Sequence, residues 1–273
     1  MNNDSSTLRR GIEVLTVLQR ASSSNGLGNN RIADFLGVDK SQVSRTLKVL
    51  LEAGLVERDD DTRTYRLGPA AYTIGMRAAD QPLMRMAAWA IREVVRVSQK
   101  RAFLVVREQS SVVTVWSDQP VDSTPVINSI GMVYSVAQFE TGRALLYAAS
   151  REEIHDVLRH DPGAPDSEEW RDEFVRRVAL DRASGYSYGV FEDGSAGLVA
   201  VPVWGIGRSV VAAIGVSSPA LRDEAELLPV VRVLLAAATG LTARLSAESR
   251  PGLPARAVPY RGWPRPPCPS KPL

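Results

Sequence analysis

The chain has 273 residues, 44% of them apolar and 23% charged, and a formal net charge of +2. This length predicts two domains, each able to bury its own core. No stretch reaches the roughly 20 uninterrupted apolar residues of a membrane span, no signal-peptide core begins the chain, and the single Cys268 excludes an internal disulfide or a cysteine-based zinc cluster. We expect a cytoplasmic protein in which any nucleic-acid binding depends on a local surface.

The first 68 residues are predicted to form one small domain. Helices are predicted at residues 8–20, 29–36 and 40–53, and strands at 55–58 and 64–67. Gly37 and Gly54 are suited to end the second and third helices, and Asp39 is suited to cap the start of the third. Three helices followed by a hairpin indicate a winged helix-turn-helix, assigned to residues 1–68.

The remaining chain is predicted to hold a linker, a second domain and a tail. A linker helix is expected within residues 69–80, and the second domain within 81–249. Its helices are predicted at 82–99, 138–149, 151–159, 168–183 and 223–247, and its strands at 103–106, 112–116, 198–204 and 209–217. Strand pairs separated by helices indicate an α+β fold with a mostly antiparallel sheet. Residues 250–273 hold eight prolines, five Lys or Arg and no acid, a composition typical of a disordered basic tail.

The third predicted helix has two chemically different faces. Val43, Leu47 and Leu50 cluster on one side and predict packing against the core. The opposite side presents polar and basic residues suited to phosphates and base edges: Ser41, Gln42, Ser44, Arg45 and Lys48. A recognition helix enters the major groove with its N-terminal residues first, and the N-terminal half of this helix is the richer in such side chains. Taken alone, the same residues also fit an ordinary solvated helix face.

The predicted hairpin leaves its own role open. Arg58, Arg63 and Arg66 lie in or beside it and can contact phosphate, whereas the three aspartates at 59–61 repel phosphate. We expect the tip to point away from the duplex, so that Arg63 or Arg66 makes any contact.

Short motifs follow one another along both predicted domains. In the first domain they are Ile32-Ala33, Gly37-Val38, Ser41 to Leu47, Leu50, Gly54-Leu55-Val56 and Tyr65-Arg66-Leu67-Gly68. In the second they are Gly142 to Leu146, Gly185-Tyr186, Glu192, Ala200 to Val203 and Ala212 to Pro219. In this order the motifs resemble the IclR family of bacterial regulators, from about Leu8 to Leu245. The resemblance implies a GAF-like effector domain, dimers or tetramers, and control of a catabolic or related operon by a small, usually carboxylate-bearing effector.

The departures from the family pattern fall on the implied effector pocket. Where the family has an Asp, a Cys and a Ser, this chain has Gly189, Leu198 and Gly215, and its polar loop is replaced by residues 137–140. Such a pocket favours an aromatic or bulky effector, because burying unpaired polar groups is costly. The expected contacts are Gly131, Met132, Gln138, Phe139, Glu192, Leu198 and Ser217. The alternative is that Leu198 and Phe139 fill the pocket and sensing is lost.

Three other patterns are poor matches to a hydrolase, a dinucleotide site and a metal site. Residues 185–189 match the G-x-S-x-G motif of hydrolases. The hydrolase triad requires a histidine after the serine, and no histidine follows Ser187 in this chain. Residues 205–210 lack the third glycine of a dinucleotide site and predict a turn. Glu152, Glu153, His155 and Asp156 are predicted to form a solvated face, with no metal or other cofactor.

We therefore expect a non-enzymatic DNA-binding regulator, either a repressor or a dual regulator, that is a homodimer or tetramer. Its expected partners are operator DNA and a small-molecule effector, with no membrane. The alternative is a ligand-binding or scaffold module whose winged helix mediates protein contacts.

Overall fold

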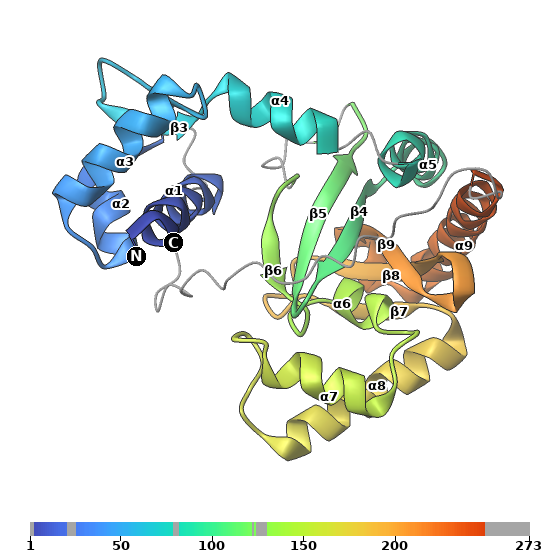
Figure 1. Ribbon diagram of the computed structural model, residues 1–273. Coiled ribbons are helices and arrows are strands. Elements are labelled where there is room, and N and C mark those ends of the chain that lie inside the picture. Colours follow the sequence, from blue (N-terminus) through green and yellow to red (C-terminus); the bar gives the residue numbers. More distant parts are fainter. Residues whose placement is uncertain (1–2, 21–25, 79–81, 122, 124–129, 249–273) are drawn as a thin grey trace. The chain divides into compact units, whose positions relative to one another are not determined.

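The computed structural model describes residues 3–20, 26–78, 82–121, 123 and 130–248, and the chain divides into two compact units. The first runs to Asp80 and the second begins at Gln81. Both are drawn in Figure 1. The predicted tail, 250–273, lies outside the described residues.

The first unit consists of helices with a small antiparallel sheet. Its elements are α1 (Asn3–Arg20), β1 (Leu27–Gly28), α2 (Asn29–Leu36), α3 (Lys40–Glu52), β2 (Val56–Arg58), β3 (Thr64–Leu67) and α4 (Pro69–Ala78). The strands pair in the order β1-β3-β2. This is the predicted winged helix-turn-helix, with β1 added at the sheet edge as a short third strand.

One apolar cluster holds this unit together. Val14, Ile32, Val43 and Leu47 are all buried completely, each contributed by one of the three helices. Full burial of such a side chain stabilises a fold by roughly 1.5–3 kcal/mol. Gly37 ends α2 in the left-handed conformation at φ 62°, as predicted, whereas Asp39 occupies the N-cap of α3 without a side-chain capping hydrogen bond. The orientation of α3 is therefore set by packing more than by its cap.

The second unit is built on a six-stranded antiparallel sheet in the order β6-β5-β4-β9-β8-β7. Its strands are β4 (Arg101–Glu108), β5 (Ser111–Asp118), β6 (Val133–Ser135), β7 (Ser187–Val190), β8 (Gly197–Trp204) and β9 (Val210–Ser218). The α+β prediction and its two strand pairs are confirmed. The edge strands β6 and β7 were not predicted, because each is only three or four residues long.

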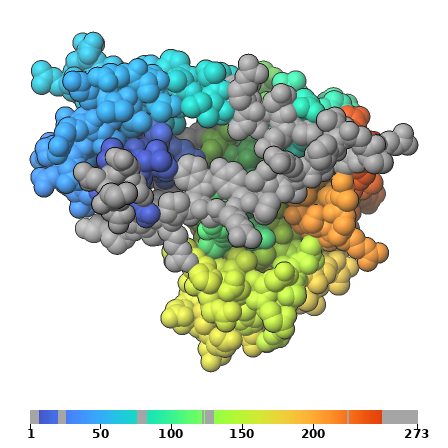
Figure 2. Space-filling view, in the orientation of Figure 1, coloured from blue at the N-terminus to red at the C-terminus, as the bar shows by residue number. Residues whose placement is uncertain are grey.

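Each face of this sheet carries its own core. Helices α5 (Pro82–Ser98) and α9 (Glu224–Glu248) pack on one face, with Ile91, Leu104 and Ile214 in the core between them and the sheet. Helix α6 (Glu140–Leu145) covers the other, followed by α7 (Arg151–Arg159) and α8 (Glu168–Ser184). Two short 3-10 helices, η1 (Ile206–Arg208) and η2 (Pro219–Arg222), complete the unit. In Figure 2, α7 and α8 form a yellow-green to yellow lobe of this unit.

Helix α9 is apolar enough, over Ala225–Ala247, to span a membrane by length and composition, with a mean hydropathy of 1.5. In this protein its apolar residues pack into the core of the second unit. Leu227, Val231, Leu234 and Leu241 belong to the core that α9 shares with α5 and the sheet. This placement indicates the core helix of a folded domain.

Candidate functional site

Helix α3 presents the polar face that its spacing predicts. Val43, Leu47 and Leu50 are buried, whereas Ser41, Gln42, Ser44, Arg45 and Lys48 are all exposed. Arg45 Nε donates to the Ser41 carbonyl at 3.3 Å, within the helix. Neither Arg45 nor Lys48 has an acidic partner in the part of the chain that the structure describes. Both cations are thus available to an external anion.

The β2–β3 hairpin is the wing of this domain, and its three arginines have different partners. Arg66 is paired with Glu57 at 2.5 Å, and the Arg58 guanidinium lies 5.6 Å from the ring centre of Tyr65. Arg63 sits in the turn at φ 55° and has no ion-pair partner among the described residues. It is therefore the wing cation most available for phosphate.

The aspartates beside Arg63 have a structural role. Asp59 Oδ1 accepts hydrogen bonds from the backbone N–H groups of Asp61 and Thr62, at 3.0 and 2.8 Å. The bond from Thr62 is the main reason that the pKa of Asp59 is lowered. The negative charge of Asp59 therefore serves to close the turn.

The structure does not bring the seven expected effector contacts into one cavity. Leu198 is a core side chain with 3% of its surface exposed, and Phe139 packs between Tyr134 and Phe191, with ring centres 5.1 and 5.6 Å away. Met132, Gln138 and Glu192 are exposed, and Gly131 is half-buried. Ser217 alone among the seven lines the groove described next.

The space that glycine leaves at 189 and 215 is taken up by the chain itself. A side chain at Gly189 would collide with the Glu140 carboxylate, and one at Gly215 would lie 2.6 Å from the Phe103 ring. Burial raises the pKa of Glu140, an effect only partly offset by a hydrogen bond from its own backbone and by the charge of Arg143. The loss of a side chain at these two positions therefore opens no space for a bulky effector beside them.

A groove of about 330 Å³ remains at the edge of this face. It is lined by Gln99, Lys100, Arg101, Gln119, Pro120, Ser123, Phe191, Ala196, Ser217, Ser218 and Pro219. The sequence interpretation included Ser217 but missed Arg101 and Phe191. Arg101 had a detectable signal, since it begins the strand at the same parity as the inward-facing Phe103 and Val105.

A buried network ties α6 to α8 and β7. Arg143 Nε donates to Asp181 at 2.6 Å, and another nitrogen of the same guanidinium donates to the Tyr188 carbonyl at 3.0 Å. Ser187, the serine of the G-x-S-x-G match, is buried at the start of β7 and hydrogen-bonds the Tyr147 hydroxyl at 3.0 Å. It is therefore not an exposed nucleophile between a strand and a helix.

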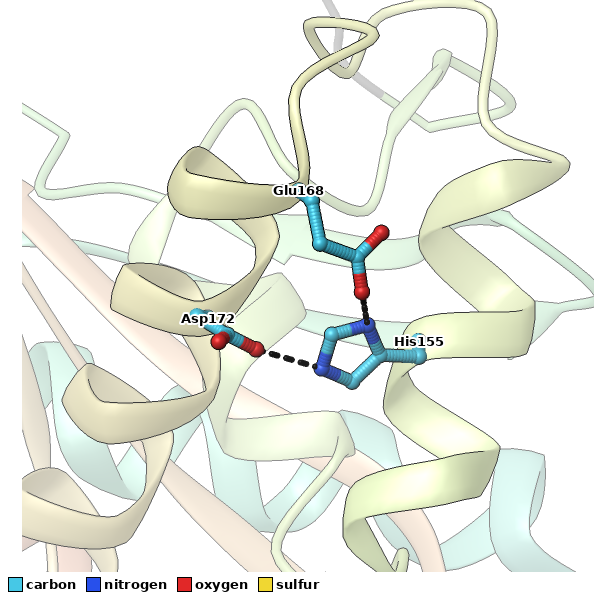
Figure 3. A group of neighbouring side chains, drawn as sticks. All are labelled: His155, Glu168 and Asp172. Atoms are coloured by element: carbon cyan, nitrogen blue, oxygen red, sulfur yellow. Dashed lines mark ion pairs between the residues drawn. The ribbon is translucent and has the colours of Figure 1, made fainter.

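His155 corrects one prediction. It is buried between α7 and α8 with 9% of its surface exposed, not on a solvated face. Its Nδ1 lies 3.6 Å from Glu168 and its Nε2 lies 2.9 Å from Asp172, on opposite sides of the ring (Figure 3). The spacing of α7 alone could not reveal this, because both carboxylates come from α8.

The same cluster fits an ion-pair link better than a metal site. Arg151 binds Asp172 at 2.6 Å, and Arg171 binds Glu168 at 3.2 Å. These two guanidinium groups already neutralise the carboxylates and repel a further cation. A metal on either ring nitrogen also faces only one of the two carboxylates directly.

A helix-turn-helix with free cations on its recognition face, joined in one chain to an α+β domain with a groove, defines a ligand-binding DNA regulator. Residues 7–60 match the IclR helix-turn-helix domain, and residues 77–243 match the C-terminal domain of the bacterial transcriptional regulator IclR. The chain belongs to the IclR family of transcription regulators, a family that is not enzymatic.

Individual relatives cover nearly the whole chain. The regulator KdgR of Escherichia coli (strain K12) is 24% identical over 253 residues, which are 88% of this chain and 94% of that protein. An IclR regulator of Alicyclobacillus acidocaldarius superposes with a TM-score of 0.76 at 24% identity, over 88% of this chain and 98% of its own. An IclR homologue of Microbacterium hydrocarbonoxydans, solved with 4-hydroxybenzoate, gives 0.73 at 21% identity, over 88% and 99%.

Proposed function

We propose that this chain is a cytoplasmic repressor or dual regulator of a catabolic operon, and that it binds its operator through the exposed face of α3. The single observation that carries the proposal is this face: Arg45 and Lys48 are exposed and unpaired within the described chain, beside Ser41, Gln42 and Ser44. Arginine can read guanine through two parallel hydrogen bonds, whereas lysine contributes sequence-independent contacts to phosphate.

The proposal includes a homodimer or a tetramer. Tyr72 on α4 leaves 71% of its surface exposed. A second copy that covers this ring would remove apolar surface from water. Two copies related by a two-fold axis would read a palindrome with half-sites about one helical turn apart, or a multiple of it.

The proposal also includes control by a small organic effector in the second unit. Its support is the groove of about 330 Å³ and the structural likeness to a homologue solved with 4-hydroxybenzoate. Because Phe103 and Glu140 occupy the space beside the two glycines, the effector is assigned to the groove instead of a deeper cavity.

Gel-shift titration with genomic fragments, including those beside its own gene, tests this function. The wild type is expected to retard a subset of fragments selectively, and Arg45→Ala to lose that selectivity. Glu52→Ala, at the end of the same helix, is the matched control and should bind as the wild type does. If no fragment is retarded, the chain is instead a ligand-binding or scaffold module whose winged helix contacts protein.

A further inference from the structure

His155 lies between two neighbouring helices, with a carboxylate beside each nitrogen of its ring (Figure 3). The residue belongs to α7 and leaves 9% of its surface exposed, whereas both carboxylates come from α8. Nδ1 is 3.6 Å from Glu168, and Nε2 is 2.9 Å from Asp172. The ring is therefore enclosed between two negative groups of another helix.

Neither contact of this ring is a hydrogen bond. The distance from Nδ1 to Glu168 is too long for one, and the buried Nε2 forms none with any described residue, although Asp172 is close. A neutral ring carries a proton on only one nitrogen, so the other nitrogen presents its lone pair to a carboxylate. Attraction between His155 and α8 therefore requires the imidazolium, in which both nitrogens are protonated.

The other charges near the ring compensate a positive charge on it. Among the described residues these charged groups come from α7, from α8 and from the loop between them: Arg151, Glu152, Asp166, Glu168, Arg171 and Asp172. Arg151 binds Asp172, and Arg171 binds both Asp166 and Glu168. Carboxylates outnumber guanidinium groups in this set, so the imidazolium has a negative surrounding.

We propose that His155 is a pH-dependent latch between α7 and α8. The imidazolium holds α7 on α8, and loss of one ring proton removes this attraction. Helix α7 should therefore loosen as the pH rises through the range of about 5 to 8, in which histidine changes its charge.

The rest of the fold confines this change to α7. Helix α8 is tied to the domain by Arg143 of α6, which binds Asp181 of α8 and the Tyr188 carbonyl of β7. Ile154 and Leu158 keep α7 in the apolar core whatever the charge of the ring. The latch therefore changes how firmly α7 is held and does not unfold the domain.

The second histidine of the chain provides an internal control. His160 follows α7 directly and has 56% of its side chain exposed. Its Nδ1 lies 2.7 Å from the carbonyl oxygen of Asp156. A neutral ring with its proton on Nδ1 satisfies this contact, so His160 needs no positive charge to keep its position.

Nitrogen-15 NMR of the imidazole rings tests the latch in the full-length protein between about pH 5.5 and 8. Only two histidines contribute signals, and His155→Gln assigns them. Both nitrogens of His155 are expected to be protonated at the acid end, and one is expected to lose its proton at the alkaline end. Over the same range the hydrogen-exchange protection factors of α7 should fall about fivefold, the effect of losing an ion pair, while those of α8 stay constant.

His155→Gln should abolish the pH dependence of α7 protection, and His160→Gln, the matched control, should retain it. Should His155→Gln not fold, Asp172→Asn replaces it, and the pH dependence should shrink because the nearest carboxylate is lost while the ring remains. The latch is overturned if His155 stays neutral or stays charged over the whole range, or if α7 and α8 lose protection alike. It is also overturned if the variant used responds to pH as the wild type does.

Discussion

Helix α3 of the first unit and the packed helices of the second unit hold their cations in different ways. On α3, Arg45 and Lys48 project into solvent with no acidic partner in the described chain. In the second unit, Arg143 contacts both Asp181 and Glu140, and Arg171 contacts Asp166 and Glu168. Paired guanidinium groups hold helices together, whereas unpaired ones remain free for external anions.

The largest expected effect comes from breaking the buried pairing. Arg143→Met leaves Asp181 and Glu140 without their main cation, and removing one partner of a buried pair typically costs about 3–5 kcal/mol. Arg177 remains 3.5 Å from Asp181, so we expect the lower end of this range. The Tm should fall by on the order of 10 °C, measured by circular dichroism.

Arg176→Met is the control for that variant. It also removes an arginine that is ion-paired within α8, but this one pairs with Glu173 in solvent. Its Tm should match that of the wild type. An equal fall in both variants contradicts the view that burial makes the Arg143 network structural.

A smaller effect is expected where an unpaired cation contacts DNA. Lys48→Ala should weaken binding to all fragments alike and reduce the slope of log K against log salt by about 1, because one phosphate contact is lost. Arg45→Ala should instead remove the preference between fragments, which corresponds to about 1–3 kcal/mol for a paired guanine contact. Gel shifts at several salt concentrations measure both quantities. If Lys48→Ala changes selectivity and Arg45→Ala changes only the salt slope, the roles are reversed.

The wing allows a finer test of the same rule. Arg63→Ala should lower DNA affinity several-fold and reduce the salt slope, since Arg63 has no described partner. Arg66→Ala should have less effect, because Arg66 is already paired with Glu57. Fluorescence anisotropy with one labelled operator compares the two directly. A larger loss for Arg66→Ala contradicts the inference that pairing withdraws a cation from DNA.

The sequence predicts single elements of the fold better than it predicts the contacts between elements. The spacing of Val43, Leu47 and Leu50 predicted both the extent of α3 and its exposed face, because a helical period is a local property. The His155 cluster and the filling of Gly215 by Phe103 join α7 to α8 and β9 to β4. Such contacts depend on register and helix packing, which no local pattern encodes. The resemblance to the family implied seven effector contacts, of which only Ser217 lines the groove, because the chain's own side chains fill the space beside Gly189 and Gly215.

The smallest effect concerns an acid buried in the second unit. Burial raises the pKa of Glu140 in the fold, so its neutral form is favoured and its contribution to stability is lost as pH rises through that raised value. Glu140→Gln should therefore raise the Tm by a few degrees at pH 7, and the gain should shrink toward the ordinary glutamate value of 4.5. The pKa of Glu169 is shifted in the opposite direction, because a hydrogen bond from Ser167 lowers it. Glu169→Gln should lower the Tm slightly at pH 7 and converge with the wild type in acid. Thermal melts between pH 4.5 and 7.5 measure both variants. If the rise in Tm caused by Glu140→Gln does not grow with pH, the charge of Glu140 is already compensated by Arg143.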